Sequence, residues 1–472
     1  MQTRIGEEQL ELVSFYIADI QHNLRIPSLA VTIIQNNDVV YQHNSGKAAL
    51  GRPVTPTTPF IVDSLSKSFT ALAIMQLVEA GKLNLDEQVQ HYIPWFHFHD
   101  LPSIPFQLRN SATSSLITIR HLLNHTSGVS RFAGRTLLSG RGGKTIEQSV
   151  RELSKVKLLR HPSSHFEYSN TNYLIVGLLI EIISGMSYEK YIQEHIFHPL
   201  QMTTSFTSEQ EARDHGMAQG YRWWFGKPVP FDAPYLLDAL PAAYIISSAA
   251  DMGRYLLACL DAGASRDSLL SPQGFAEMYK PQATVPGKHS SYGLGWRIER
   301  LGDEPILRHG GEVTNFRADM VLVPGHQLGV IVLSNCNNGM IAQLGLDQIA
   351  LNLSRVLLGQ PLPHKKLTFR GFYALVDILV VTISLVQVGS LVQLLRLLVL
   401  HRRPTRVGIG SLLALLGDVI GPVVLLWRMP KWADMLWRGL LLYVPDVSRW
   451  VVGMSIISIV KSGIRVYQRL KS

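Results

Sequence analysis

Two long apolar runs near the C-terminus restrict the fold more than any other feature of the chain. Residues 371–395 carry one charge, Asp377, near their start, and residues 407–427 carry one charge, Asp418, within them. Each run reaches the roughly 20 residues that a membrane-spanning helix needs. The sequence therefore predicts that the chain ends in a membrane tail.

A third run, at about 439–460, is less apolar because it contains Pro445, Asp446 and Arg449. The two charges are three residues apart, so on a helix they would share one face and neutralise each other. Alternatively, this segment is a helix that lies in the membrane interface. We expect a tail over residues 371–472 with two or three spanning helices, joined by a linker at 361–370 to a domain over residues 1–360.

The positive charge is concentrated in this tail. The 14 lysines and arginines and four acidic residues from Lys366 onward give it +10, so the first 365 residues carry −1 of the net +9. A basic patch on the N-terminal domain, which nucleic-acid binding would need, is therefore not expected. The basic segments at 401–406 and at the C-terminus are typical of cytoplasmic loops, and they place the N-terminal domain outside a cell membrane that the chain crosses several times. The basic loop at 428–438 opposes this orientation.

An exported domain is expected to begin with a signal peptide. The first 27 residues contain no apolar stretch of the 7–15 residues that such a peptide needs. We expect that the true start of the protein lies upstream of this sequence. The alternative is that the domain stays inside the cell.

The first 360 residues are expected to form one mixed α/β unit of the α+β type. Residues 28–35 and 38–46 alternate like two strands joined by a turn, and strand patterns return at 293–301 and beyond. The segment 84–240 between them is mostly helical in pattern, with loops rich in proline. Strands at both ends predict an antiparallel sheet built from both ends of the domain, flanked by helices, with a mostly helical insertion.

The segment VDSLSKSFT (62–70) stands between a strand pattern and a helix pattern. If a helix begins near Ser64, then Lys67 lies on the same face, where its amine can approach the serine hydroxyl. A serine hydroxyl needs an adjacent base to become a nucleophile, and the free N–H groups of a helix N-terminus suit an oxyanion. Taken alone, however, the segment is explained more simply by Ser64 as a helix cap.

Two further segments contain groups that suit acyl chemistry. Tyr168 and Asn170 flank a serine before an apolar helix pattern. A phenol whose phenolate is favoured by a cationic amine can act as a base or proton relay, and an amide can orient a lysine or hold a substrate amide. His309, Gly310 and Gly311 precede a strand pattern, where glycines let a substrate approach the backbone. Each segment alone also fits an ordinary capping loop or turn.

Together, in the order Ser-x-x-Lys, Tyr-x-Asn and His-Gly-Gly, these segments resemble the serine β-lactamase and penicillin-binding-protein superfamily. The similarity is greatest to its class C-like branch, which includes D-alanyl-D-alanine carboxypeptidases, D-amino-acid peptidases and esterases. Four more segments are typical of that branch: LLNHTSGV (122–129), YSNTNY (168–173), HPLQM (198–202) and YGLGW (292–296). The resemblance covers about residues 10–355 and does not extend to the tail.

The resemblance implies catalytic roles for three residues and a positioning role for a fourth. Ser64 would be acylated. Lys67 and Tyr168 would share the proton transfers that activate Ser64 and later the deacylating water. Asn170 would orient Lys67 and the substrate amide. The active site would lie between the sheet and the helical insertion.

The resemblance also implies a substrate-binding wall and an oxyanion hole. His309 would replace the lysine that other members have in the third motif, and Gly310 and Gly311 would lie beside the substrate. The backbone N–H groups of Ser64 and Glu312 would form the oxyanion hole. Because a histidine lacks a fixed ammonium, carboxylate binding would depend on pH.

We therefore predict a membrane-anchored serine hydrolase that needs no cofactor and acts through an acyl-enzyme on a β-lactam, a D-amino peptide or an ester. The alternative is a catalytically weak penicillin-recognising domain that binds cell-wall peptide and signals through the membrane tail. A histidine-rich segment, HYIPWFHFHD (91–100), suggests zinc, but its proline and aromatic residues favour a packed loop. His125 is expected to be structural.

Overall fold

The computed structural model of the 472-residue chain describes residues 5–49, 51–99, 113–133, 143–265, 268–339, 345–363, 368–400, 409–432 and 437–470. The chain forms two compact units. The first is built from residues 1–222, 230–337 and 345–364, and the second from residues 223–229, 338–344 and 365–472. The predicted boundary near residue 360 therefore misses two short segments, 223–229 and 338–344, that belong with the tail.

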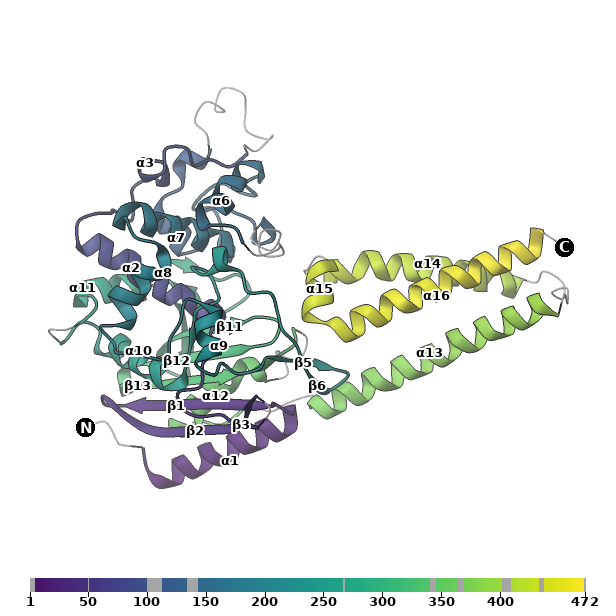
Figure 1. Cartoon of the computed structure of the whole chain (residues 1–472), viewed down its shortest axis with the longest axis horizontal. Helices are drawn as coiled ribbons and strands as arrows, with labels where there is room; N and C mark the ends of the chain where they lie inside the picture. Colours follow the sequence, from purple (N-terminus) through teal and green to yellow (C-terminus); the bar gives the residue numbers. More distant parts are fainter. Residues whose placement is uncertain are drawn as a thin grey trace. The chain divides into compact units, whose positions relative to one another are not determined.

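The first unit is built on a nine-stranded sheet in the order β3-β2-β1-β13-β12-β11-β10-β9-β8, with antiparallel neighbours throughout (Figure 1). The strands are β1 (Ser28–Gln35), β2 (Asp38–Ala49), β3 (Arg52–Pro53), β8 (Ala283–Thr284), β9 (Ser291–Tyr292), β10 (Arg297–Leu301), β11 (Glu304–Glu312), β12 (Arg317–Val323) and β13 (Leu328–Ser334). Strands from the two ends of the unit meet where β1 pairs with β13. The prediction of an antiparallel sheet built from both ends is confirmed.

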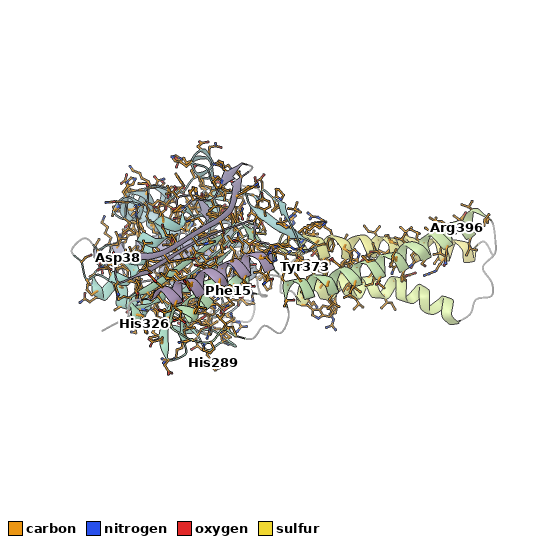
Figure 2. The ribbon with its side chains drawn as sticks, turned by 90° about the horizontal axis from the view of Figure 1, so that it is seen from below. Phe15, Asp38, His289, His326, Tyr373 and Arg396 are labelled. Atoms are coloured by element: carbon orange, nitrogen blue, oxygen red, sulfur yellow. The ribbon has the colours of Figure 1, made fainter. Side chains whose placement is uncertain are left out.

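Helices pack on the middle of this sheet, so that β1 and β13 are buried at every residue. The helices α1 (Glu7–Leu24) and α12 (Ile349–Leu357) pack together, and α12 packs on β12 and β13. The Asn352 amide of α12 donates a hydrogen bond of 2.9 Å to the Tyr16 hydroxyl of α1. Helix α10 (Ala249–Asp261) packs on β1 and β13. Phe15 points away from this packing on the exposed side of α1 (Figure 2).

Within the predicted helical insertion, residues 84–240, the described α-helices are α3 (Val89–Tyr92), α4 (Ile119–Leu123), α6 (Ile146–Arg151), α7 (Asn170–Ser184), α8 (Tyr188–Ile192) and α9 (Glu209–Asp214). Helices α2 (Ser66–Glu79) and α11 (Pro272–Tyr279) lie on either side of it in the sequence. Helix α7 packs against α2, α4, α6 and α8, and every residue from Thr171 to Ile180 is buried. This central position explains the strongly apolar sequence of α7. Short strands β4 (Phe60–Ile61) and β7 (Ile246–Ser247) pair just before the turn that carries Ser64.

The second unit contains α13 (Phe369–Val399), α14 (Ile409–Trp432), α15 (Trp437–Tyr443) and α16 (Pro445–Leu470). Two helices among the described residues are long and apolar enough to cross a membrane: α13, and α16 as far as Tyr467, with mean hydropathies of 2.2 and 1.3. Figure 2 shows Arg396 near the C-terminal end of α13. Helix α14 overlaps the second predicted run, 407–427, and continues beyond it to Trp432. Residues 407–408, the side chains of 409–416 and the basic segment 401–406 are outside the described part of the chain.

The third predicted run is divided in the structure. Helix α15 ends at Tyr443 and α16 begins at Pro445. Proline suits the first turn of a helix, where its missing N–H is not needed, and it cannot continue the helix before it. The hydrophobic helix is therefore shifted toward the C-terminus relative to the predicted 439–460.

The second unit also contains the tip of a hairpin formed by β5 (Tyr221–Trp224) and β6 (Lys227–Pro230). The Trp223 ring lies against Phe369, with centroids 5.8 Å apart, and Asp446 accepts a hydrogen bond of 3.1 Å from the Phe225 N–H. The Arg449 guanidinium lies over the Trp224 ring, 5.5 Å from its centroid. The predicted Asp446–Arg449 ion pair is therefore replaced by contacts that each residue makes with the hairpin.

Candidate active site

Ser64 lies in a turn of 3-10 helix, Asp63–Leu65, that leads directly into α2. The turn places Lys67, in the first turn of α2, beside it: the Lys67 Nζ donates a hydrogen bond of 3.1 Å to the Ser64 Oγ. A second hydrogen bond of 2.6 Å runs from the same Nζ to the Ala242 carbonyl oxygen. Lys67 is completely buried, so its amine is held in one place beside the serine hydroxyl.

The other two serines of the segment make backbone contacts instead. The Ser66 Oγ accepts a hydrogen bond from the Ile245 N–H, and the Ser68 Oγ donates one to the Leu65 carbonyl oxygen. The N-cap position of α2 is Leu65, with no side-chain cap. The structure therefore removes the capping explanation for Ser64 and leaves it as the serine that faces the lysine.

Burial decides the protonation of Lys67. Removing the ammonium from water lowers its pKa, and the nearby Asp63 carboxylate opposes this effect. The Tyr168 and Tyr173 rings lie 4.9 and 5.6 Å from the Nζ, measured to their centroids. A lysine with a lowered pKa is available as a neutral amine, which is the form that can accept a proton from Ser64.

Tyr168 completes the group of side chains around Ser64. Its hydroxyl hydrogen-bonds to Ser64, and burial raises the pKa of the phenol. The expectation of a favoured phenolate is therefore wrong, because loss of hydration outweighs the Ser64 hydrogen bond and the positive charge of Arg297. The phenol is a protonated group that can pass a proton on.

His125 holds the loop that carries Tyr168. The buried His125 has a positive φ of 61°, and its ring lies 4.4 Å from the Tyr168 ring, centroid to centroid. Its Nδ1 accepts a hydrogen bond of 3.2 Å from the Ser169 N–H and lies 3.2 Å from the Asn172 Nδ2. These contacts agree with a structural rather than a catalytic histidine.

Asn170 is the first residue of α7 and does not hold Lys67 as expected. The Ala242 carbonyl oxygen takes the hydrogen bond that Asn170 was expected to accept. The Asn170 Oδ1 is buried and has no partner within the described part of the chain. A buried amide oxygen without a partner is costly, so it is ready to accept a hydrogen bond from a substrate N–H.

His309 lies on β11 and is buried. Its Nε2 is 3.0 Å from the Tyr292 hydroxyl, and its Nδ1 is 3.0 Å from the Gly310 carbonyl oxygen. Burial, followed by the positive charges of Lys67 and Arg297, holds the pKa of His309 well below its usual value. The imidazole is therefore neutral at neutral pH and does not supply the charge of the lysine it would replace.

Arg297 is a residue that the sequence analysis missed. It lies on β10, and its charge lowers the pKa values of both His125 and His309. In the antiparallel pairing of β10 with β11, Arg297 stands opposite Arg308, the residue before His309. The signal in the sequence was its position directly after the YGLGW segment, where a charged residue begins a strand.

The two glycines of the third motif have different surroundings. A Cβ on Gly311 would stand 2.3 Å from the Val62 carbonyl oxygen, whereas the nearest atom to a Cβ on Gly310 would be 3.7 Å away. Gly311 thus allows β11 to lie against the backbone just before Ser64. This approach brings the Glu312 N–H next to the Ser64 turn.

Asp63 is the second residue that the sequence analysis missed. Its buried carboxylate accepts hydrogen bonds from the Glu312 N–H and from the Ser64 N–H. Burial raises the pKa of this carboxyl group, while Lys67 and the two N–H donors oppose the rise. The donors expected to form the oxyanion hole are therefore both in contact with Asp63.

Comparison with known proteins gives relatives over most of the first unit. Residues 15–353 match the protein family described as Beta-lactamase. Protein flp of Staphylococcus aureus strain MW2 is 27% identical over 350 residues, which cover 72% of this chain and 66% of that protein. Penicillin-binding protein 4 of Amycolatopsis lactamdurans is 28% identical over 346 residues, or 71% of this chain and 86% of that protein. The chain thus spans slightly less than two thirds of the length of the flp protein.

Solved structures share the fold. The octameric penicillin-binding protein homologue from Pyrococcus abyssi superposes with a TM-score of 0.62 at 28% identity, covering 74% of this chain and 78% of that one. A class C β-lactamase superposes with a TM-score of 0.61 at 20% identity, covering 76% of this chain and 98% of that one. Since the sequence match and the shared fold extend over the same unit, this chain belongs to the β-lactamase family of serine hydrolase type.

Proposed function

We propose that this protein is a membrane-anchored serine hydrolase in which Ser64 forms an acyl-enzyme. The observation that carries the proposal is the 3.1 Å contact between the Lys67 Nζ and the Ser64 Oγ, at a buried position where the lysine pKa is lowered. With the amine neutral, the direction of this hydrogen bond reverses and Ser64 donates its proton.

In the acylation step, the Ser64 oxygen bonds to the substrate carbonyl carbon while its proton moves to Lys67. The negative charge that develops on the carbonyl oxygen is stabilised by the N–H groups of Ser64 and Glu312. The bond from the carbonyl carbon to the leaving nitrogen or oxygen then breaks. The leaving group receives the proton from Lys67 through the Tyr168 hydroxyl.

Deacylation uses the same groups with water as the nucleophile. Lys67 and Tyr168 take a proton from the water, whose oxygen bonds to the acyl carbon. The ester bond to Ser64 breaks, and the proton returns to the Ser64 oxygen. Each turnover consumes one water and releases a carboxylic acid, and no cofactor takes part.

Arg297 favours acyl donors that carry a carboxylate. Its positive charge acts on the wall formed by His309, which is itself neutral. A guanidinium binds a carboxylate in a bidentate manner, so D-amino peptides and β-lactams that carry this group suit the site better than uncharged esters. The relative named Penicillin-binding protein 4 supports this order of substrates.

Membrane anchoring is proposed from the tail. The helices α13 and α16 supply the apolar length, and with α14 as a third span the basic segments at 401–406 and at the C-terminus would lie in the cytoplasm. With this orientation, the catalytic domain lies outside the cell, where cell-wall peptides are found.

A second function is favoured by one observation. Because Asp63 contacts both N–H groups of the oxyanion hole, the site is also compatible with a catalytically weak domain that recognises penicillin or cell-wall peptide. The two functions differ in whether acyl groups are turned over.

The experiment is a turnover assay on the full chain in detergent, with a β-lactam, a D-amino peptide and an activated ester. The hydrolase predicts turnover of at least one substrate that is lost in Ser64→Ala and retained in Ser68→Ala, whose hydroxyl donates to the Leu65 carbonyl oxygen. Folded protein with neither turnover nor covalent labelling would select the binding function.

A further inference from the structure

The Asp63 carboxylate contacts the two N–H groups that are expected to bind a reacting carbonyl oxygen. In the site described above, the N–H groups of Ser64 and Glu312 stabilise the oxyanion, and both of them hydrogen-bond to Asp63. Hydrogen bonds from N–H groups to a carboxylate are stronger than those to a neutral carbonyl oxygen. A substrate carbonyl therefore competes with a better acceptor that is already in place.

The backbone holds Asp63 in this position. Its φ of 46° is in the left-handed region, which side-chain-bearing residues rarely adopt and which aspartate tolerates better than most. This conformation occurs at the residue before the nucleophile, where glycine would fit without strain. The chain thus keeps a carboxylate at a position whose backbone favours the residue that has no side chain.

We propose that the Asp63 carboxylate is an internal occupant of the oxyanion hole, so that an acyl substrate reacts only after this side chain releases the N–H groups of Ser64 and Glu312. The inference rests on the proposed hydrolase function and adds a form of regulation to the same site.

Occupancy of the oxyanion hole by Asp63 slows acylation for two reasons. While Asp63 accepts both hydrogen bonds, the oxyanion lacks the donors that lower its energy. A carboxylate beside the reacting carbonyl also repels the negative charge that forms there. The release step breaks two hydrogen bonds and no covalent bond.

Asp63 also carries a negative charge that acts on Lys67, and the test must separate this effect from occupancy. The charge raises the Lys67 pKa and so keeps the amine protonated to a higher pH. The charged or titratable groups that face Asp63 are Lys67 of α2, Glu312 of β11, and Tyr168 and Tyr244 from two loops. Of these, Lys67 is the group whose protonation state controls the nucleophile.

The experiment measures the second-order rate of acylation by a fluorescent penicillin and by a fluorophosphonate as a function of pH. The proteins are the full chain in detergent and its variants Asp63→Gly, Asp63→Asn and Ser64→Ala. If a variant changes the pKa of Lys67, the midpoint of the profile of acylation rate against pH moves. If a variant changes how far Asp63 occupies the oxyanion hole, the plateau rate at high pH changes, because Lys67 is neutral there in every variant.

Occupancy predicts that Asp63→Gly raises the plateau tenfold or more, since one oxyanion-hole donor is worth about 10²–10³ in rate. Glycine suits the positive φ, so this variant is expected to fold. If it does not fold, Asp63→Asn decides in its place, because a neutral amide oxygen is a weaker acceptor than a carboxylate. A plateau that stays within twofold of the wild type, or falls, overturns the inference even if the midpoint moves.

Failure of the underlying function has a different signature. If folded wild-type protein and both Asp63 variants show no labelling, or if labelling persists in Ser64→Ala, the hydrolase function fails and the inference with it. If labelling depends on Ser64 but the Asp63 variants do not raise the plateau, the hydrolase function stands and only the inference fails.

Discussion

Lys67 is surrounded by two tyrosine rings, one carbonyl oxygen and one carboxylate, and burial outweighs the carboxylate in setting its pKa. An ordinary lysine titrates above pH 10 and would be a poor base at neutral pH. Proteins bring the pKa of a lysine toward neutral pH by burying it with too few negative charges to offset the loss of hydration.

We predict that Lys67→Met lowers the acylation rate by about 10²–10⁴, the usual contribution of a general base. Methionine keeps an unbranched apolar stem in the buried position, so the thermal midpoint should not fall. The wild-type rate should rise with pH through the lowered pKa and reach its plateau well below pH 10. Stopped-flow labelling across pH 5–10 measures both effects, and a rate in Lys67→Met close to that of the wild type would exclude the lysine as base.

Two buried histidines predict the behaviour of the protein in acid. His125 and His309 have folded-state pKa values well below the usual 6.5, chiefly because of burial. Below pH 6.5 the unfolded chain binds protons that the folded chain does not, so stability is complete above this pH and is lost as the pH falls. Each histidine lowers the free energy of unfolding by about 1.4 kcal/mol per pH unit.

His309→Asn should therefore reduce by one the number of protons taken up on unfolding below pH 6.5. The free energy of unfolding then falls less steeply as the pH is lowered. Urea unfolding at pH 7, 6 and 5, followed by tryptophan fluorescence, measures the slope. The matched control is His289→Asn, because the wild-type His289 side chain is exposed. An unchanged slope in His309→Asn would show that this histidine titrates normally.

At the level of single residues, the sequence predicts that Ser64 lies beside Lys67 but not the charges around them. Ser64 and Lys67 are three residues apart in one helical turn, so local geometry was enough to bring them together. Asp63 directly precedes Ser64, but its role was missed because its contact with the Glu312 N–H depends on β11, which lies far away in the sequence. The effect of Arg297 on His309 likewise depends on β10 and β11. The protonation of Tyr168 depends on burial, which the sequence alone does not show.

Among the secondary-structure elements, β11 can pack closely against the turn before α2 only because residue 311 is a glycine. Gly311→Ala places a Cβ 2.3 Å from the Val62 carbonyl oxygen, so either β11 or the turn must move. We predict a loss of about 1–3 kcal/mol in stability, typical of overpacking, and a loss of at least tenfold in acylation.

Gly310→Ala is the matched control for this prediction, because its Cβ meets no atom closer than 3.7 Å. It should retain the stability of the wild type. Thermal melting and labelling rates of the two variants measure the difference. Equal effects of the two alanines would contradict the close approach at Gly311.

The helices of the tail are joined by a polar cluster. Asp418 of α14 pairs with Lys461 of α16 at 2.9 Å and with Arg465, and Lys461 also donates to the Gln387 Oε1 of α13 at 2.5 Å. Removing one partner of a buried ion pair typically costs about 3–5 kcal/mol. We predict that Asp418→Asn separates the tail helices and increases their proteolysis in detergent micelles.

Asp377→Asn is the control for the tail, because Asp377 is exposed on α13. It should leave the rate of proteolysis unchanged. Mass spectrometry of the limited-proteolysis fragments compares the two variants. If the Asp418→Asn tail and the wild-type tail are equally protected from proteolysis, the polar cluster does not hold the tail helices together.

Elements with a strong local pattern were predicted from the sequence. The alternation in residues 28–35 corresponds to β1, and the apolar run after Tyr168 corresponds to α7. The third tail helix begins later in the sequence than predicted, because Pro445 fits a helix start better than a helix interior.

At the scale of the whole molecule, the chain combines a β-lactamase-family domain with a helical tail. Composition revealed this division, since the basic and apolar residues are concentrated after Lys366. The hairpin tip at 223–229 was not predicted to belong with the tail, because that association depends on contacts such as those of Asp446 with the Phe225 N–H.

The central claim is that Ser64 of the intact protein becomes acylated. The most direct measurement is intact-mass spectrometry of the full chain in detergent after incubation with a penicillin, followed by peptide mapping of the adduct. We predict one added acyl group per chain, located on Ser64, present in Ser68→Ala and absent in Ser64→Ala. An adduct on another residue, or an adduct that remains in Ser64→Ala, would contradict the proposed mechanism.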